Sequence, residues 1–494
     1  MQPIFSNEES QKIDVKAIAS GISGECLMEN AGRAVVDQIL KRWQPKEVVV
    51  LCGPGNNGGD GYIIARLLNE INWSVKVLTI IDPSQLEGDA KVASLKWTGD
   101  VVLLNEEQDY LNAELIIDCL YGTGLSRPLD KETVELINYY KSLKTKVVSV
   151  DLPSGVHGNT GEVLGTAIEA DLTVTFCNLK RAHFLLPGKE LCGEIVVVDI
   201  GIPKQIINQI DFLTFWNQPI AWINSFPIPQ SNTHKYIRGH TFIIGGDRYS
   251  TGAARLAAEA SLRIGAGAVS IIAERNALDV YAKHLTAVML EPSEKLQSII
   301  ANTNLKSFVI GPGTGLGKYT ESCLDKILES NSPCVIDADA LSIIARKPDY
   351  FFPKLHADCI LTPHEGEFTR MFDNSHDKLT SCQSSVAKTG ANVVFKGSDT
   401  IIAAACGKKI SINNNAAPWL ATAGSGDVLG GLIAGLQSQG MPSFEAACAG
   451  VWLHGELGTK LGPGLISEDI SKSLPKLLHD LFNIKPLSQK ISYN

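Results

Sequence analysis

Short runs of β-branched and other apolar residues recur along this 494-residue chain, separated by helix-like stretches. In the first part they are EVVVLC (47–52), SVKVLTI, ELIIDCL, KVVSVDLP, DLTVTF and EIVVVDI. In the second part they are HTFIIGG (240–246), AVSIIA, SFVIGPG, PCVIDAD, DCILTPHEGE, ANVVFKG and TIIAAA. Such runs are typical of a parallel sheet that helices cover on both faces. The sequence therefore predicts an α/β fold in both parts.

The alternation breaks between about residues 203 and 236, where proline recurs among polar and aromatic residues. The chain is also longer than one hydrophobic core usually supports. We therefore expect two domains, residues 1–224 and 225–494. No internal repeat period relates the two halves.

Four helical features stand out. Ser6 can cap a helix with Glu9 three residues on, and a second helix is expected at about 25–43. In the second domain, a long alanine-rich helix is expected from about Gly252, and two or three helices close the chain from Gly426.

Charge and composition narrow the function. The net charge is −9 with no stripe of lysine and arginine, which argues against nucleic acid as the ligand and favours a small molecule. The 11 cysteines lack CxxC pairs and metal-ligand spacing, so buried reduced thiols are expected. The acidic N-terminus has no signal-peptide character, and no apolar run approaches the roughly 20 residues that span a bilayer. A cytoplasmic protein that does not bind membranes is expected.

Two loops rich in glycine and acid, GPGNNGGDG (53–61) and AGSGD (423–427), each lie between an apolar run and a helical pattern. Glycine lets backbone N–H groups approach an anion closely, and a helix N-terminus adds positive dipole at the same place. Each loop is a candidate phosphate cradle, and the carboxylate in each adds possible proton chemistry. The chain is therefore expected to carry two active sites.

The first loop differs from a plain GxGxxG fingerprint because it carries two asparagines and an aspartate. Two further turns, DCLYGTGLSRP (118–128) and VDLPSG (150–155), follow the next strands. The three strand ends are expected to present four side chains at one rim: Asn57, Asp118, Asp151 and Ser154. Singly, each is more often a turn residue, but their shared location favours oxygen ligands of a hard cation.

The second loop places Gly424, Ser425 and Gly426 at the start of an apolar helix, with Asp427 in the first turn. Backbone N–H groups there can stabilise a transferring phosphoryl group, and Asp427 can accept a hydroxyl proton. A helix-capping aspartate is the alternative interpretation of an isolated Gly-Asp pair.

GPGNNGGDG, DCLYGTGL and VDLPSG, in this order, resemble the N-terminal domain of the NAD(P)H-hydrate epimerase family, a Rossmann-like three-layer sandwich. The resemblance implies potassium ligands at Asn57, Asp118 and Ser154. It also implies that Asp151 is the acid/base that moves protons at the hydrated C6. The implied substrate-binding residues are Asn56, Asn57, Gly58, Gly59, Asp60, Gly122, Thr123, Gly124, Leu125, Ser126, Arg127, Pro128 and Asp151.

GGDRYSTGAARLAAEASLRIGAGAV (245–269), VIGPGTG, TPHEGEF and KGSDT, together with GSGD, resemble the ribokinase-like superfamily, most closely its NAD(P)H-hydrate dehydratase branch. The implied nucleotide-binding residues are Lys396, Gly397, Ser398, Asp399, Thr400, Gly424, Ser425 and Gly426. The implied hydrate-site residues are Ala253, Gly313, Gly315, His364 and Asp427. A loop histidine alone is more often a surface residue, and His183 and His356 keep that interpretation.

The second resemblance implies that the nucleotide phosphorylates the C6 hydroxyl and that phosphate then leaves to restore the dihydronicotinamide. Asp427 would activate the hydroxyl, and Mg²⁺ would bridge the nucleotide phosphates. We expect ADP, giving AMP and phosphate, rather than ATP, because fused domains are typical of the bacterial members. Both families are commonly oligomeric, so a homo-oligomer is expected.

Two departures from the family pattern are Tyr236, in HKYIRGH, and Ala416–Ala417, where glycine is common. They affect substrate positioning more than the proposed base. Two alternatives remain at this stage. One is a small-molecule kinase of the ribokinase superfamily, and the other is a non-catalytic nucleotide-binding module as first domain.

Overall fold

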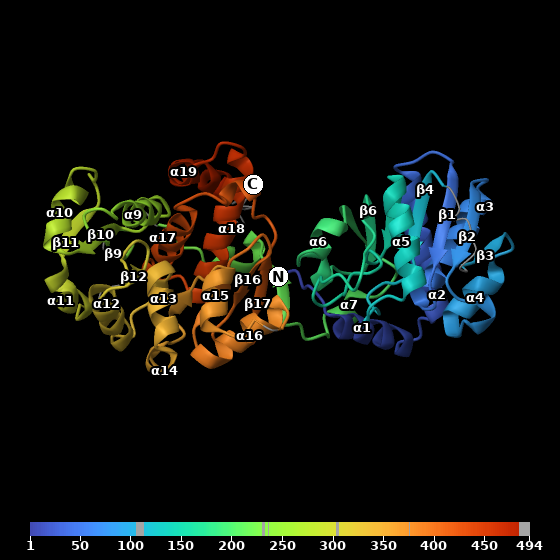
Figure 1. Ribbon diagram of the computed structural model, residues 1–494, viewed down its shortest axis with the longest axis horizontal. Helices are drawn as coiled ribbons and strands as arrows, with labels where there is room; N and C mark the ends of the chain where they lie inside the picture. The colour runs from blue at the N-terminus through green and yellow to red at the C-terminus, as the bar shows by residue number, and fades with distance from the viewer. Residues whose placement is uncertain (105–112, 230–232, 236, 303–305, 375, 484–494) are drawn as a thin grey trace, which may run out of the picture. The chain divides into compact units, whose positions relative to one another are not determined.

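The computed structural model describes residues 1–104, 113–229, 233–235, 237–302, 306–374 and 376–483. Tyr236 lies outside these residues. The chain forms two compact units, one of residues 3–214 and one from Phe215 onward together with Met1 and Gln2 (Figure 1). The division thus lies before the predicted boundary at 224/225. Residues 215–224 pack with the second unit because Phe215 contacts Phe444 and the buried Trp222 contacts Trp452.

Among the described residues of the N-terminal unit, seven strands form a parallel sheet in the order β3-β2-β1-β4-β5-β6-β7. The strands are β1 (Glu47–Cys52), β2 (Ser74–Thr79), β3 (Val101–Leu103), β4 (Leu115–Cys119), β5 (Lys146–Val150), β6 (Leu172–Phe176) and β7 (Glu194–Val198). The helices are α1 (Asn7–Ala19), α2 (Gly24–Leu40), α3 (Asn56–Glu70), α4 (Gly88–Lys96), α5 (Lys131–Leu143), α6 (Gly188–Leu191) and α7 (Lys204–Ile207). The parallel α/β prediction is confirmed for this unit.

The predicted cap of the first helix is confirmed. The Ser6 hydroxyl accepts a hydrogen bond from the Glu9 N–H (3.1 Å), and the Glu9 carboxylate accepts one from the Ser6 N–H (2.7 Å). Each side chain thus satisfies a backbone donor that the first turn of a helix leaves open. This capping box sets the start of α1, a helix whose residues line a cavity of the N-terminal unit.

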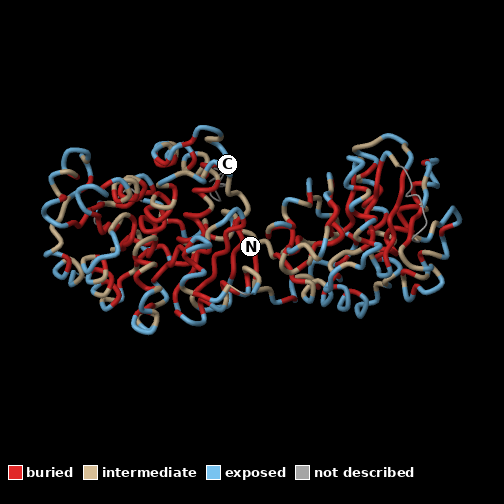
Figure 2. The backbone as a smooth tube through the Cα atoms, in the orientation of Figure 1, coloured by how far each residue is buried: buried red, intermediate tan, exposed pale blue. Residues whose placement is uncertain are grey.

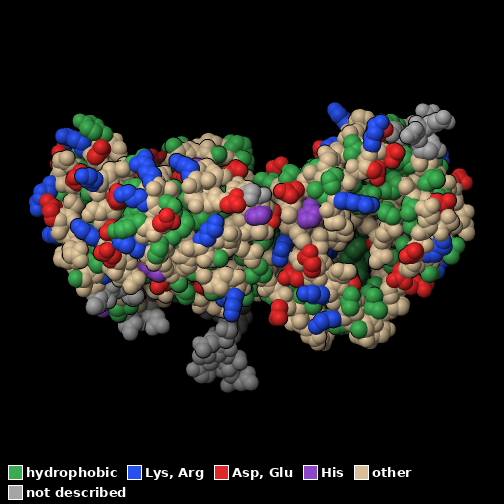
Figure 3. Space-filling view, turned by 60° about the horizontal axis from the view of Figure 1, so that its bottom comes forward, with side chains coloured by type: hydrophobic (Ala, Val, Ile, Leu, Met, Phe, Trp, Pro, Cys, Tyr) green, Lys and Arg blue, Asp and Glu red, His purple; other side chains and the backbone are tan. Residues whose placement is uncertain are grey.

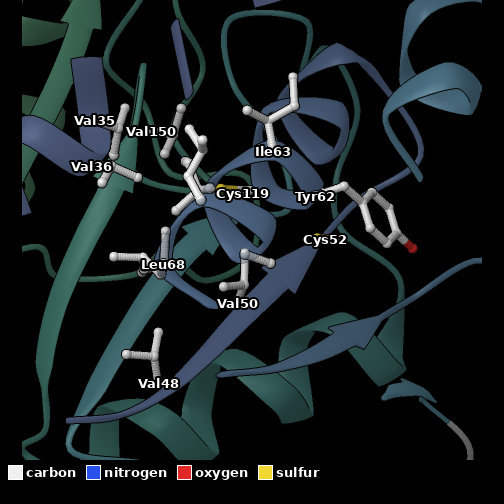
Figure 4. Close-up of a cluster of buried hydrophobic side chains, with 14 of the residues drawn as sticks. Val35, Val36, Val48, Val50, Cys52, Tyr62, Ile63, Leu68, Cys119 and Val150 are labelled. Carbon is white, nitrogen blue, oxygen red and sulfur yellow. The ribbon is translucent and has the colours of Figure 1, made fainter. Parts of the chain in front are cut away.

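Alternate residues of β1 face opposite sides of the sheet, as the strand period requires. Val48, Val50 and Cys52 pack against α2 and α3 in one hydrophobic cluster (Figure 4). Val49 and Leu51 pack in a second cluster with residues of α5. The buried strands therefore lie between two helical layers, and Figure 2 shows buried backbone concentrated in the sheet.

Gly61 of α3 lies directly against the sheet. A β-carbon there would approach Cys52 Sγ to 2.7 Å and Cys119 Cβ to 2.9 Å, closer than real contacts allow. We expect Gly61→Ala to lower the free energy of unfolding by about 1–3 kcal/mol through overpacking, despite the better helix propensity of alanine. Thermal or denaturant unfolding of the full chain measures this effect.

The matched control for Gly61→Ala is Gly430→Ala. A β-carbon at Gly430 would meet its nearest neighbours, Val309 and Val335, at 3.8 Å, an ordinary contact. This change should be neutral or stabilising by up to about 1 kcal/mol. Equal effects of the two substitutions would contradict the packing explanation.

Within the described part of the second unit, ten strands form one sheet in the order β11-β10-β9-β12-β13-β14-β15-β16-β17-β8. They are β8 (Thr214–Trp216), β9 (His240–Ile244), β10 (Ala268–Ala273), β11 (Met289–Pro292), β12 (Lys306–Ile310), β13 (Cys334–Ile336), β14 (Cys359–Leu361), β15 (Asn392–Phe395), β16 (Thr400–Ala403) and β17 (Ile410–Asn413). Pairing is parallel from β11 to β15 and antiparallel from β15 to β17. The α/β prediction is confirmed here too, with an antiparallel edge.

The helices of the second unit are α8 (Pro219–Trp222), α9 (Gly252–Arg263), α10 (Arg275–Ala282), α11 (Leu296–Ile300), α12 (Lys318–Glu329), α13 (Ala338–Arg346), α14 (Pro348–Phe351), α15 (Glu365–Met371), α16 (Lys378–Thr389), α17 (Ser425–Ser438), α18 (Ser443–Leu461) and α19 (Ser467–Asn483). The predicted alanine-rich helix is α9, and the predicted closing helices are the last three.

Helices α9 and α17 pack with very little space between their backbones. A β-carbon at Gly431 would lie 2.2 Å from the Ala257 carbonyl oxygen, and one at Gly435 would lie 3.0 Å from Ser261 Cα. The alanines of α9 and the glycines of α17 therefore have a packing role. This close contact fixes the position of α17, whose first residues belong to the AGSGD loop.

Three further features concern surface charge, membrane-spanning helices and cysteines. On the face shown in Figure 3, basic and acidic side chains are interspersed. No helix in the described ranges combines the length and apolar character needed to cross a membrane. The cysteines are free, and most of them are buried.

Candidate active sites

The loops after β1, β4 and β5 border a cavity of about 820 Å³ in the N-terminal unit. A smaller pocket of about 160 Å³ shares part of its lining. Most of the predicted substrate-binding residues line the larger cavity: Asn56, Asn57, Asp60, Gly122, Thr123, Gly124, Leu125, Ser126, Arg127 and Asp151. The structure thus brings three separate sequence motifs to one cavity.

Three of the predicted residues, Gly58, Gly59 and Pro128, do not line this cavity. A β-carbon at Gly58 would lie 2.0 Å from the Gly53 carbonyl oxygen, and one at Gly59 would lie 2.7 Å from Met28 Sδ. These two glycines let the start of α3 pack tightly against the preceding turn and α2. In the structure, Gly58 and Gly59 serve close packing.

Asp151 follows β5 in a left-handed conformation, with φ 68°, which is uncommon for a residue other than glycine. Its carboxylate Oδ1 accepts hydrogen bonds from Lys180 Nζ (2.6 Å) and Thr175 Oγ1 (2.9 Å). Burial opposes ionisation of Asp151, but the Lys180 ammonium and the Thr175 hydroxyl outweigh it and hold the pKa of Asp151 below its ordinary value. Asp151 is therefore a carboxylate at neutral pH.

Lys180 and His183 are functional candidates that the sequence interpretation missed. His183 Nδ1 accepts from the Lys180 N–H, and Nε2 lies 3.0 Å from the Asp151 carbonyl oxygen, so Nε2 carries the proton. Burial lowers the pKa of His183 to about 4, so the ring is neutral. The interpretation of His183 as a surface residue was wrong, because only the fold brings residue 183 against residue 151.

Asp118 and Ser154 do not line the cavity, so the structure does not bring all four predicted side chains to one rim. Both are fully buried. The Asp118 carboxylate accepts hydrogen bonds from the Ser154 N–H (2.8 Å), the Ser149 hydroxyl (2.8 Å) and the Ser154 hydroxyl. Asn57 and Asp151, in contrast, line the cavity itself.

Two observations bear on whether these oxygens suit a cation. Asp118 forms no ion pair among the described residues, so its buried charge has only hydrogen bonds to compensate it, and burial raises its pKa. The Asn57 amide nitrogen donates to the Val150 carbonyl oxygen (3.2 Å), and the Asn57 amide oxygen accepts from the Gly122 N–H (3.2 Å). Asn57, Asp118 and Ser154 offer oxygen atoms, the ligand type that hard cations prefer.

The second unit has a cavity of about 540 Å³ beside the N-terminus of α17. The predicted nucleotide-binding residues in its lining are Lys396, Gly397, Ser398, Thr400, Ser425 and Gly426, together with His364 from the predicted hydrate site. Ala416 and Ala417 also line it, so this departure from the family pattern lies in the cavity wall.

Asp399 and Gly424, also predicted to bind nucleotide, do not line this cavity. Asp399 is buried and pairs with Lys378. Gly424 has φ 86°, the left-handed region that favours glycine, and a β-carbon there would lie 2.5 Å from Leu256. Gly424 therefore sets the turn into α17, and Asp399 braces the loop that carries Lys396.

The first turn of α17 is open toward a charged cluster. No side-chain hydrogen bond caps the helix at Gly424; the Ser425 N–H donates to the Thr422 carbonyl oxygen (3.4 Å), and the next N–H groups of the first turn lie at the positive end of the dipole. A β-carbon at Gly426 would lie 3.6 Å from both Asp337 Oδ2 and Lys396 Nζ. The absence of a side chain at Gly426 therefore leaves access to this ion pair.

Asp337, at the end of β13, is a second candidate that the sequence interpretation missed. Its Oδ1 accepts from Lys396 Nζ (2.9 Å), and Lys396 Nζ lies 4.0 Å from Glu367 Oε2. Burial, together with the negative charge of Asp337, raises the pKa of Asp427 to about 6, against the opposing effect of Lys396. Three carboxylates thus surround one lysine, so the cluster carries net negative charge.

His364 is the N-cap of α15, and its side chain is 57% exposed. Its Nδ1 accepts from the Gly366 N–H (3.0 Å), and its Nε2 lies 3.5 Å from Glu367 Oε1. The expectation of an exposed histidine at the sheet edge is confirmed. The ring is open to the cavity that Lys396 and Gly426 also line.

The remaining predicted hydrate-site residues lie on neighbouring loops. A β-carbon at Gly313, in the loop after β12, would lie 3.3 Å from Ala253 Cβ at the start of α9 and 3.2 Å from the Ser250 carbonyl oxygen in the loop after β9. The Gly315 N–H donates to Asp339 Oδ2 at 2.8 Å. Contact of these residues with a ligand stays a prediction, as it does for the other predicted site residues.

Each unit therefore presents a carboxylate and a lysine at the carboxyl edge of a parallel sheet, beside a cavity large enough for a small molecule. The fold and these sites define an α/β enzyme with two sites. Residues 24–182 match the family described as YjeF-related protein N-terminus, and residues 241–476 match the NAD(P)H-hydrate dehydratase family.

Three relatives match over nearly the whole chain, and each is a bifunctional NAD(P)H-hydrate repair enzyme Nnr. The relative from Thermofilum pendens is 35% identical and covers 93% of both chains. Those from Coxiella burnetii and Escherichia coli are 32% and 31% identical and cover 97% and 92% of this chain, and 100% and 89% of their own. The chain belongs to the family of bifunctional NAD(P)H-hydrate repair enzymes. This confirms the resemblance and favours it over the kinase alternative.

Proposed function

We propose that this chain converts the R and S forms of NAD(P)H hydrate into each other in its N-terminal unit and dehydrates the S form in its second unit. Dehydration would use ADP and give NAD(P)H, AMP and phosphate. The observation that carries the proposal is the presence, in each unit, of a carboxylate of shifted pKa near a lysine at a cavity beside the family motifs. Asp151 lines both N-terminal cavities, whereas in the second unit Lys396 lines the cavity and Asp427 directly follows the lining residue Gly426.

In the N-terminal site, Asp151 takes and returns a proton at the hydrated C6. Lys180 keeps it ionised, and His183 holds the strained Asp151 backbone by its hydrogen bond to the carbonyl oxygen. Asn57, Asp118 and Ser154 would hold potassium through their oxygens, and such an ion would supply positive charge against the buried Asp118. The loop 122–127 would contact the nucleotide part of the substrate.

In the second site, Asp427 takes the proton of the C6 hydroxyl as that oxygen attacks the terminal phosphorus of ADP. The open N–H groups at the start of α17 stabilise the charge on the transferring phosphoryl group, and AMP leaves. The C6–O bond then breaks toward phosphate and a proton leaves C5, which restores the dihydronicotinamide. Phosphate is a better leaving group than hydroxide.

Magnesium would be held with the ADP phosphates beside Asp337, Glu367 and Asp427, whose carboxylates exceed the single charge of Lys396. When bound, it would offset phosphate charge. Lys396 would orient both the carboxylates and the phosphates. We also propose a homo-oligomer as the working form.

The direct test gives the purified chain separate R and S NADPH hydrates with ADP, Mg²⁺ and K⁺, and follows recovery of reduced-cofactor absorbance. Consumption of both forms supports the proposal. If S alone reacts and R persists at its spontaneous rate, the epimerase part is wrong. If neither reacts while a small-molecule alcohol is phosphorylated, the kinase alternative is correct.

Dehydration should depend on pH through Asp427. Its pKa is raised to about 6, and the base form is required, so activity should be full above that value and fall about tenfold per pH unit below it. The measurement is kcat at saturating S hydrate and ADP between about pH 5 and pH 8. A rate that stays constant down to about pH 5 would contradict the assignment of Asp427 as base.

A further inference from the structure

Helix α1 forms one wall of the N-terminal cavities, although it precedes the residues that match the family, 24–182. Ser10 and Asp14, one helical turn apart, line both the larger cavity and the smaller pocket. The Ser10 hydroxyl oxygen is buried and has no hydrogen-bond partner among the described residues. The polar side of α1 is therefore directed at the site that contains Asp151.

Asp14 is open to the cavity and forms no hydrogen bond or ion pair within the described ranges. Its carboxyl faces Asp60 of α3, Asp151 after β5, and Cys177 and Lys180 after β6, while Asp89 of α4 also lines the smaller pocket. Partial desolvation in the cavity raises the pKa of Asp14 to about 6; Asp151 adds to this effect, and Lys180 opposes it. The protonated form of Asp14 is therefore more accessible than that of an ordinary aspartate.

Lys180 is not available as the second proton carrier. Its ammonium donates to Asp151 Oδ1 (2.6 Å), to Thr175 Oγ1 (2.7 Å) and to the Phe176 carbonyl oxygen (3.0 Å), which uses all three N–H bonds. The side chain is also only 6% exposed. Lys180 is thus a positioning residue for Asp151.

Inversion at C6 requires proton transfer on both faces of the ring. The hydroxyl leaves from one face as water, which needs an acid, and water adds to the other face, which needs a base. One carboxylate at the end of β5 cannot reach both faces of a bound ring. Asp14 approaches the same cavity from α1, a different wall.

We propose that Asp14 is the second catalytic residue of the epimerisation, and that it works on the face of C6 opposite Asp151. The inference rests on the proposed function of the N-terminal unit. Protonated Asp14 gives its proton to the departing C6 oxygen, the C6–O bond breaks, and the N1 lone pair forms the C6=N1 bond. Water then adds to the other face and loses a proton to Asp151. The reverse reaction exchanges the two roles, and solvent returns the protons.

Ser10 fits this step because its unpartnered hydroxyl lies one turn from Asp14 on the cavity side of α1. It can hold the departing water by a hydrogen bond. Ile13 and Leu27 also line the smaller pocket beside Asp14.

The test compares Asp14→Asn, Asp14→Glu and the control Asp37→Asn in the full-length chain. Asp37 is an exposed carboxylate of α2 that lines neither cavity. Pure R hydrate is supplied, S hydrate is measured by chromatography without ADP, and dehydration of pure S hydrate is measured separately. We expect Asp14→Asn to lower the epimerisation kcat about 100-fold or more, with S dehydration unchanged. Asp14→Glu should recover part of the rate, and Asp37→Asn all of it.

The pH profile separates catalysis from structure. Epimerisation by the unmodified chain should depend on a group titrating near pH 6, and Asp14→Asn should lose this dependence while its thermal unfolding matches that of Asp37→Asn. An Asp14→Asn rate within about threefold of the unmodified chain, or a change in KM alone, overturns the inference. If the unmodified chain does not epimerise, the proposed function of this unit fails first.

Discussion

Asp427→Asn is expected to reduce dehydration of S NAD(P)H hydrate by about 10²–10⁴-fold while epimerisation of the R form continues at the unmodified rate. The amide keeps the size of the side chain but cannot accept the hydroxyl proton. Because Asp427 lies in the first turn of α17, its neighbour Gly426 keeps its position in the cavity lining, and we expect ADP still to bind. The loss should therefore appear in kcat rather than in the KM for ADP.

The control for this experiment is Asp279→Asn. Asp279 is an exposed carboxylate of α10 that forms no hydrogen bond or ion pair among the residues the structure describes. Dehydration by this variant should equal that of the unmodified chain. Asp427→Asn with more than a tenth of the normal kcat would show that another group removes the proton. Loss of both activities together would indicate that the change damages the fold rather than the base.

Asp151→Asn is expected to abolish epimerisation, by a similar factor of about 10²–10⁴, and to leave S dehydration intact. It also carries a cost in stability, because the Asp151 and Lys180 side chains are only 13% and 6% exposed. Removing the charge of one partner from a buried pair leaves the other uncompensated, and this costs about 3–5 kcal/mol. Thermal unfolding should therefore occur at lower temperature in this variant.

A double variant separates the chemical effect from the structural one. Adding Lys180→Met to Asp151→Asn removes the unpaired ammonium and should restore much of the lost stability. Epimerisation should nevertheless remain absent, because the acid/base is still missing. Recovery of epimerisation in the double variant would show that the single change acts by destabilising the unit, and Asp151 would then not be the catalytic carboxylate.

The sequence predicted the strands well because they are buried on both faces and therefore read as unbroken apolar runs. EVVVLC became β1 (Glu47–Cys52), and AVSIIA became β10 (Ala268–Ala273). The strands that no run predicted, β3, β8, β11 and β17, are short and lie at or near the sheet edges. The compact second unit begins at Phe215, before the predicted boundary, because aromatic side chains that follow Phe215 pack into it.

The glycine loops were recognised from the sequence, but the roles of single residues within them were not. Asn56 and Asp60 line the cavity, whereas Gly58 and Gly59 between them pack against the fold. A loop that turns into a helix directs successive residues to different sides, and spacing alone does not say which side carries the ligand.

The local motifs thus determined the α/β class, the family and the two acid-bearing loops, since each depends on residues adjacent in the chain. The tertiary structure alone decided what surrounds the two acids. Lys180 and His183 reach Asp151, Asp14 enters its cavity from α1, and Asp337 lies beside Asp427. These groups come from different strand ends and helices. Their burial and mutual charge, which set the protonation of each carboxylate, therefore exist only once the sheet has formed.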